Sequence, residues 1–200
     1  HQHITNTPKK FLKEKLDIDI NEDPEIQINS SLVSQTKENY KINKNNVNIL
    51  LGIGGSGHTK RVPSKIFLSF IDKITKVKKC KFFLATGKNV EEQMILKEIL
   101  ESKFKNDCVP LDDLSIKEIL PIIKNCNLSI CNDSSFSHLS AALNIKTITL
   151  MVDTPIIYGN YNSKMFPIIP DGETTVSHHT SGKDKMNPEK IFNTVIEILN

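Results

Sequence analysis

A glycine-rich loop with the sequence GIGGSGHTK ends at Lys60 and follows a short apolar run. Its small residues, among them Gly55, let backbone amides approach an oxyanion closely. The hydroxyls of Ser56 and Thr59 and the ammonium of Lys60 add further donors. The loop has neither the GxxxxGK[ST] frame of a P-loop nor the GxGxxG spacing of a dinucleotide-binding turn. We therefore expect a phosphate-binding loop of another kind, with a flexible glycine turn as the alternative.

A second polar loop, CNDSSFSHLSAAL, follows another apolar run. Asp133, Ser134 and Ser135 open the next expected helix, and Ser137 and His138 lie in its first turn. Helix capping alone would explain an aspartate and a serine at this position. Capping does not explain why two further serines and a histidine share the same turn. The loop is therefore a second candidate binding site.

The chemistry of the second loop favours a ligand with both phosphate and hydroxyl groups. Free amides at a helix N-terminus attract a phosphate, whereas the nearby carboxylate of Asp133 would repel one. The carboxylate is better suited to accepting hydrogen bonds from sugar hydroxyls. Together these groups predict a site for a nucleotide sugar.

The remaining candidate groups are less informative. Asp153 follows an expected strand in MVDTPIIYGN, and a simple strand-to-turn exit is the favoured interpretation there. His178 and His179 are adjacent and do not share a helical face, so we expect no metal site. The four cysteines form no CxxC pair and lie in or beside apolar runs, which predicts buried free thiols: Cys80, Cys108, Cys126 and Cys131.

Both loops fall within an alternating pattern of strands and helices. Expected strands cover residues 46–53, 80–85, 128–131, 146–152 and 166–169, and expected helices cover 63–77, 90–104, 114–125 and 134–143. Pro121 should kink its helix or mark its start. A final helix follows Asn187 and Pro188. This pattern predicts an α/β fold, a Rossmann-like parallel sheet with helices on both faces.

The first 45 residues are more irregular. We expect short helices near residues 9–16 and 31–41 with an extended segment between them. The domain organisation predicted is a connector over residues 1–45 and a sugar-nucleotide-binding lobe with a C-terminal helix over residues 46–200.

Composition excludes several classes of function. The 200 residues include 26 Lys and Arg, 23 Asp and Glu, 6% aromatics and no Trp, and the net charge is +3. This charge is too small and dispersed for a nucleic-acid-binding face. The sequence contains no apolar stretch long enough to span a membrane and no apolar leader. We expect a cytoplasmic protein, soluble or peripheral at the inner face of the membrane.

The two polar loops together resemble glycosyltransferase family 9, the ADP-heptose:lipopolysaccharide heptosyltransferases. Members show a loop ending in Lys-x-Trp-Pro and a later Asn-Asp-[Ser/Thr]-Gly-x-x-His-Leu-Ala-Ala signature. Here the first motif reads KRVP from Lys60, and the second reads NDSSFSHLSAA from Asn132. The likeness covers residues 47–154. Val62 stands at the usual Trp, and Ser135 stands at the usual glycine.

The resemblance implies one lobe of a GT-B fold, the donor-binding half of an inverting, metal-independent transferase. The donor would be a nucleotide sugar, ADP-heptose in the family, and the acceptor a glycan or lipopolysaccharide core. Lys60 would neutralise the diphosphate, Asp133 would hold sugar hydroxyls, and the amides from Ser134 to Ser137 would cradle phosphate beside His138.

In the family an N-terminal lobe supplies the acidic base and the acceptor pocket, and 200 residues do not include it. Residues 1–45 resemble the end of that lobe and the connector. We therefore expect the chain to be inactive unless this lobe is supplied in cis or in trans. Two alternatives remain, a catalytically inactive nucleotide-sugar-binding module and another GT-B phosphosugar enzyme such as an epimerase.

Overall fold

The computed structural model describes residues 5–200, and within them a six-stranded sheet forms the centre of the fold. The strand order is β3-β2-β1-β4-β5-β6, and every neighbouring pair is parallel. This arrangement confirms the predicted Rossmann-like sheet. The strands are β1 (Val47–Gly52), β2 (Cys80–Ala85), β3 (Cys108–Pro110), β4 (Leu128–Asn132), β5 (Thr147–Leu150) and β6 (Met165–Ile168).

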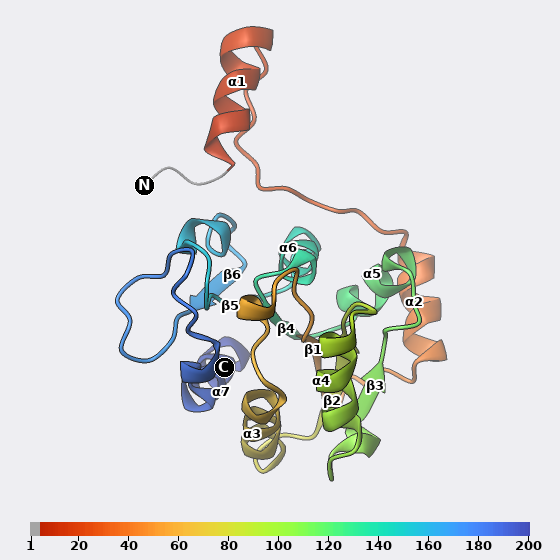
Figure 1. The fold of residues 1–200 in the computed structure, drawn as a ribbon. Coiled ribbons are helices and arrows are strands. Elements are labelled where there is room, and N and C mark those ends of the chain that lie inside the picture. The colour runs from red at the N-terminus through yellow and green to blue at the C-terminus, as the bar shows by residue number, and fades with distance from the viewer. Residues whose placement is uncertain (1–4) are drawn as a thin grey trace.

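Helices cover both faces of the sheet, as Figure 1 shows. One apolar core lies between the sheet and α3, α4 and α7, and the second lies on the opposite face against α5 and α6. α2 packs against α5. The helices are α1 (Asn6–Leu16), α2 (Ser30–Asn39), α3 (Ser64–Thr75), α4 (Val90–Leu100), α5 (Ile116–Lys124), α6 (Ser135–Ala142) and α7 (Pro188–Leu199).

The central strands are apolar on both faces because helices cover both. Ile49, Leu50 and Leu51 of β1 are fully buried, and they alternate between the two cores. Continuous apolar strands of this kind are typical of parallel sheets. Several helices start at a polar cap, as when the Asn89 side chain accepts a hydrogen bond from the Glu91 amide at the start of α4.

Two details differ from the sequence-based expectation. β3 was not predicted, because its three residues at the sheet edge are only partly buried and give little apolar signal. Pro121 does not mark the start of its helix but lies buried inside α5. The capping box of Ser115 and Glu118 fixes the helix start upstream of the proline. The four cysteines are buried and free, as predicted.

The first 45 residues divide into two parts. α1 buries none of its residues and projects away from the sheet in Figure 1. In contrast, Ile26, Ile28 and Ile42 pack against the core on the α5 side. The division at residue 45 stays a prediction.

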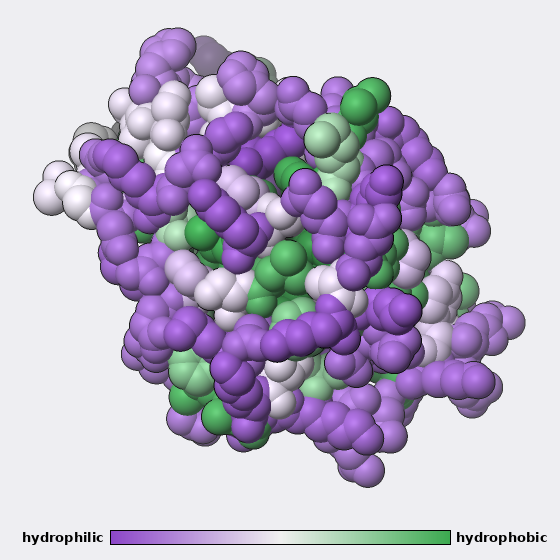
Figure 2. Space-filling model, turned by 60° about the horizontal axis from the view of Figure 1, so that its bottom comes forward, coloured by the Kyte–Doolittle hydropathy of each residue, from purple (hydrophilic) through white to green (hydrophobic). Residues whose placement is uncertain are grey.

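The face in Figure 2 shows mostly hydrophilic residues, with apolar ones in small areas between them.

No helix among residues 5–200 is long and apolar enough to cross a membrane.

The carboxyl ends of the strands all lie at one edge of the sheet. β1 pairs with β2 on one side and with β4 on the other, so successive strands are added in one direction from β1 to β3 and in the opposite direction from β4 to β6. Ligands of open α/β sheets bind in the crevice at such a switch point. The loops after β1 and β4 border this crevice.

Candidate functional site

An ion pair joins the two loops that the sequence singled out. Lys60 Nζ lies 2.9 Å from Asp133 Oδ2, although 73 residues separate them. The Lys60 side chain is 24% exposed and that of Asp133 only 7%. The pair therefore places a cation and a largely buried carboxylate at the same point of the crevice.

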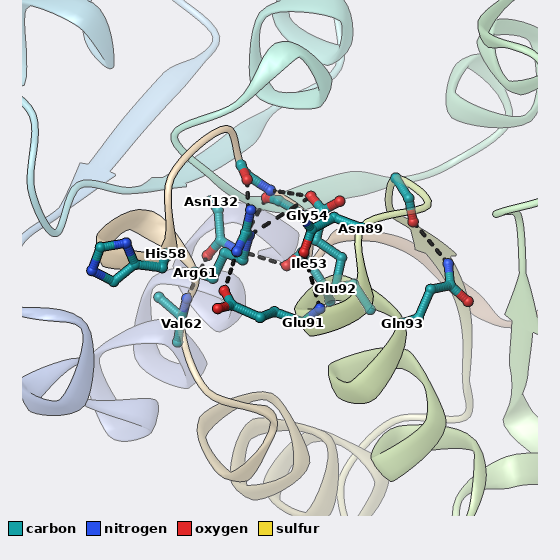
Figure 3. A network of polar contacts seen from close by, with 12 residues as sticks. Ile53, Gly54, His58, Arg61, Val62, Asn89, Glu91, Glu92, Gln93 and Asn132 are labelled. Carbon is teal, nitrogen blue, oxygen red and sulfur yellow. Dashed lines mark hydrogen bonds and ion pairs between the residues drawn. The ribbon is translucent and has the colours of Figure 1, made fainter.

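Asn132, the last residue of β4, fixes the path of the loop after β1. Its Nδ2 donates to the carbonyls of Ile53 at 2.9 Å and of Gly54 at 3.2 Å. Its Oδ1 accepts from the Val62 amide at 3.4 Å. The Asn132 side chain is fully buried, and Figure 3 shows it among these partners. Both ends of the glycine-rich loop are therefore anchored to β4.

Arg61 and Glu92 hold the middle of the same loop. The Gly55 amide donates to Glu92 Oε1 at 2.7 Å, and the Gly55 carbonyl accepts from Arg61 Nε at 2.9 Å. Arg61 also pairs with Glu91, and all of these side chains gather at the start of α4 in Figure 3. The amide of Gly55, a predicted donor to the ligand, is thus already occupied by a buried carboxylate.

Two glycines lie directly beside the carboxylate of Glu92. A Cβ at Gly54 would lie 2.6 Å from Glu92 Oε1, and a Cβ at Gly87 would lie 2.6 Å from Glu92 Oε2. Such contacts are shorter than side-chain carbons tolerate. A side chain at either glycine would therefore require the end of the Glu92 side chain to move.

We expect Arg61→Ala to lower the free energy of unfolding by about 1.5 to 3 kcal/mol, because it removes a charge-assisted hydrogen bond to a buried carbonyl. Arg61→Lys should still show more than half of this loss in the free energy of unfolding, because lysine lacks the planar guanidinium group of arginine. Urea unfolding measures both effects. Lys65→Ala is the control, because Lys65 is exposed. Equal free energies of unfolding for Arg61→Ala and wild type would show that the arginine does not stabilise this loop.

The N-terminus of α6 supplies hydrogen-bond donors to the crevice. Ser134 occupies the N-cap position, but its side chain caps no amide, and its buried Oγ has no partner among the described residues. The amides of Ser135 and Phe136 begin the helix and have no acceptor within it. In contrast, Ser137 donates both its hydroxyl, at 2.7 Å, and its amide, at 3.1 Å, to the Ser134 carbonyl. Ser137 is therefore a structural residue.

His138 lies one turn into α6 and contacts Tyr161. Its Nδ1 is 2.8 Å from the Tyr161 hydroxyl, and the two rings stack with centroids 5.6 Å apart. Burial lowers the pKa of His138, the carboxylate of Asp133 opposes this effect, and the positive charge of Lys60 adds to it. The resulting pKa lies below the ordinary value. The surroundings of His138 therefore favour its neutral imidazole over a second cation beside Lys60.

A pocket of about 600 Å³ extends from these loops toward β2 and α5. Its apolar wall consists of Leu114, Ile116 and Ile119. Polar lining comes from Thr86, whose buried Oγ1 has no partner among residues 5–200, and from Ser56 and Ser135. An apolar wall with a few unsatisfied polar groups is typical of a small-molecule site.

The structure thus brings most of the predicted site residues to one crevice. Gly55, Ser56, Ser134 and Ser135 line the pocket, and Lys60, Asp133 and His138 lie together beside α6. Thr59 is different, because it lies in the 3-10 turn His58–Lys60 and does not line the pocket. Sequence reasoning missed Glu92, which has the appearance of an ordinary acidic residue in the first turn of a helix. Only the tertiary fold shows its contact with Gly55.

Comparison with known proteins gives a consistent picture. The sequence matches glycosyltransferase family 9 (heptosyltransferase) over residues 2–196. It is 30% identical over 150 residues to lipopolysaccharide heptosyltransferase 1 of Campylobacter coli, covering 73% of this chain and 43% of that protein.

Solved structures show the same fold at lower identity. The E. coli ADP-heptose lipopolysaccharide heptosyltransferase II is 18% identical with a TM-score of 0.72, covering 88% of this chain and 53% of that one. An E. coli heptosyltransferase solved with ADP is 15% identical with a TM-score of 0.73, covering 98% and 57%. The chain spans about half the length of these relatives.

The fold and the crevice define a Rossmann-like lobe of the GT-B class of glycosyltransferases. The chain belongs to glycosyltransferase family 9, the heptosyltransferase family, as its loop motifs indicated.

Proposed function

We propose that the chain is the donor-binding half of an inverting, metal-independent heptosyltransferase. The observation that supports this most is the meeting of Lys60 and Asp133 beside the open amides of α6. These groups supply a cation and hydrogen-bond donors for a diphosphate and an acceptor for sugar hydroxyls. The donor is a nucleotide sugar, ADP-heptose by analogy with the E. coli relatives.

Each group has a distinct role in this proposal. The Lys60 ammonium neutralises the diphosphate, and the amides of Ser135 and Phe136 hydrogen bond to a phosphate oxygen. Lys60 remains close enough to Asp133 for the ammonium to contact both the carboxylate and the phosphate. Asp133 then accepts hydrogen bonds from the sugar. The pocket beside Leu114 and Thr86 accommodates the nucleoside.

Transfer without a metal ion requires another source of positive charge at the leaving diphosphate. Lys60 and the N-terminus of α6 provide it by electrostatic stabilisation of the charge that develops as the sugar departs. The acidic base and the acceptor pocket come from an N-terminal lobe, and the acceptor is a glycan or lipopolysaccharide core.

A catalytically inactive binding module is the second candidate. It is favoured by Ser135, which is exposed at the pocket where the family signature has a glycine. A side chain there reduces how closely a ligand approaches the helix. Both candidates require nucleotide binding, and they differ in whether transfer occurs once the N-terminal lobe is present.

We expect the purified 200-residue chain to bind ADP and ADP-heptose in calorimetry and to transfer no sugar by itself, because the base and acceptor pocket lie on the other lobe. Addition of an N-terminal lobe from a family member should give transfer if the enzyme assignment is correct. Failure to bind either nucleotide would contradict the proposed function. Binding without transfer in the presence of the lobe would favour the inactive module.

A further inference from the structure

A pocket of about 390 Å³ lies at the amino edge of the sheet, the edge opposite to the crevice. The last turns of α2 and α5, which lie side by side in Figure 1, and the start of β1 border it. Its volume falls in the range of small-molecule sites. It shares no lining residue with the pocket in the crevice, so a ligand here would occupy a second site.

Three lysines and no carboxylate line this pocket. Lys37 lies in the last turn of α2, Lys124 ends α5, and Lys44 lies in the turn before β1. Within residues 5–200 none of the three forms an ion pair. The Lys124 ammonium donates to the Leu143 carbonyl at 2.8 Å, which leaves it further donors. Cations gathered in one pocket without a counter-charge favour an anionic ligand.

Asn125 fixes the two helix ends that carry Lys37 and Lys124. Its Nδ2 donates to the carbonyl of Val33 in α2 and to that of Pro121 in α5, each at 2.9 Å. The fold itself, and not a contact between the lysines, therefore brings these two cations to the same pocket.

Asn48 fixes the turn that carries Lys44. It is the second residue of β1 and is only 2% exposed. Its Nδ2 donates to the carbonyls of Asn43 at 3.0 Å and of Asn46 at 3.1 Å, which lie on either side of Lys44 in the chain. Its backbone amide donates to Asn127 Oδ1 at 2.8 Å. These contacts hold the third lysine beside the other two.

The side-chain oxygen of Asn48 is buried at this pocket and has no hydrogen-bond partner within residues 5–200. The amide group is not reversed, because Nδ2 already donates to two carbonyls. An amide oxygen only accepts hydrogen bonds, and a buried acceptor without a donor is costly. It would repel a phosphate oxygen but accept a hydrogen bond from a hydroxyl group. The pocket therefore combines cations for an anion with one acceptor for a hydroxyl.

We propose that this pocket binds a phosphate ester with free hydroxyl groups, either a soluble polyol phosphate or the head group of a phospholipid. The ammoniums of the three lysines contact the phosphate, and Asn48 Oδ1 accepts from a hydroxyl. Ile42, which is buried at the pocket, packs against the carbon chain. This site does not depend on the role proposed for the crevice.

Calorimetry with glycerol 3-phosphate, and with propyl phosphate as the matched ligand without hydroxyls, tests the ligand class. We expect glycerol 3-phosphate to bind about three- to tenfold more tightly, because only its hydroxyls reach a buried acceptor. Saturating ADP should leave this affinity unchanged. Equal affinities for the two ligands, or displacement of glycerol 3-phosphate by ADP, would overturn the proposal.

The double variant Lys37→Gln/Lys44→Gln tests the location. It should weaken binding of glycerol 3-phosphate by about ten- to a hundredfold, because two charge-assisted contacts are lost. Lys65→Gln/Lys97→Gln is the matched control, since it removes the same charge at exposed positions elsewhere. Equal affinities of the two double variants would overturn the proposal, as would a wild-type chain that binds no glycerol 3-phosphate.

Co-sedimentation with vesicles distinguishes the two sources of the phosphate ester. Vesicles of equal parts phosphatidylcholine and phosphatidylglycerol present a phosphate joined to a glycerol with free hydroxyls. Binding to these vesicles that Lys37→Gln/Lys44→Gln loses and the control keeps would support the site and assign it to a lipid head group. Binding of free glycerol 3-phosphate alone would support the site and assign it to a soluble ester.

Discussion

Replacing Lys60 by alanine is expected to weaken ADP binding by about ten- to a hundredfold, because a charge-assisted contact to a phosphate contributes roughly 1.5 to 3 kcal/mol. The remaining binding should depend less on salt concentration. The variant should also unfold more easily, by about 1 to 3 kcal/mol, since Asp133 is 7% exposed and loses its partner. Calorimetry and urea unfolding measure the two effects separately.

A second substitution separates binding from stability at this pair. In Lys60→Ala/Asp133→Asn the buried charge is gone, so stability should recover, whereas ADP affinity should stay low. Lys65→Ala controls for the loss of a lysine, because Lys65 is exposed on α3. Arg61 is unsuitable as a control, since it anchors Gly55. Equal ADP affinities of Lys60→Ala and Lys65→Ala would exclude Lys60 from the diphosphate site.

Asp133→Asn is expected to weaken binding of ADP-heptose more than binding of ADP. The carboxylate is assigned to sugar hydroxyls, and an uncharged amide both accepts those bonds less strongly and presents donors to them. We expect a loss of about tenfold for the nucleotide sugar and less than about threefold for ADP.

Calorimetry with both ligands on the same preparation measures this difference. The loss for ADP is small because the change also removes a negative charge close to the phosphates. Equal losses for both ligands would assign Asp133 to the orientation of Lys60 alone and remove its contact with the sugar.

The fold could be predicted from sequence because its main strands are continuous apolar runs. Residues 46–53 and 80–85 are long enough and apolar enough to mark the centre of a parallel sheet, and both become buried strands. β3 has three residues at an edge and gives no comparable signal. Of the two expectations for Pro121, a helix start was wrong, because the capping box upstream decides where α5 begins.

The candidate site could be predicted only in part. Parallel topology places the ends of β1 and β4 at the same edge, so the two polar loops had to be neighbours. The sequence contains no comparable signal for the pairing of Glu92 with Gly55, because this contact depends on how the loop after β1 packs against α4. Such contacts determine which amides remain open to a ligand, and a motif alone does not show this.

A crystal structure of the chain with bound ADP tests the central assignment most directly. We predict that the diphosphate lies between Lys60 and the amides of Ser135 and Phe136, with Gly55 still hydrogen bonded to Glu92. The nucleoside should occupy the pocket beside Thr86 and α5. A diphosphate bound elsewhere on the molecule, with the Lys60 to Asp133 pair intact and the crevice empty, would contradict this assignment.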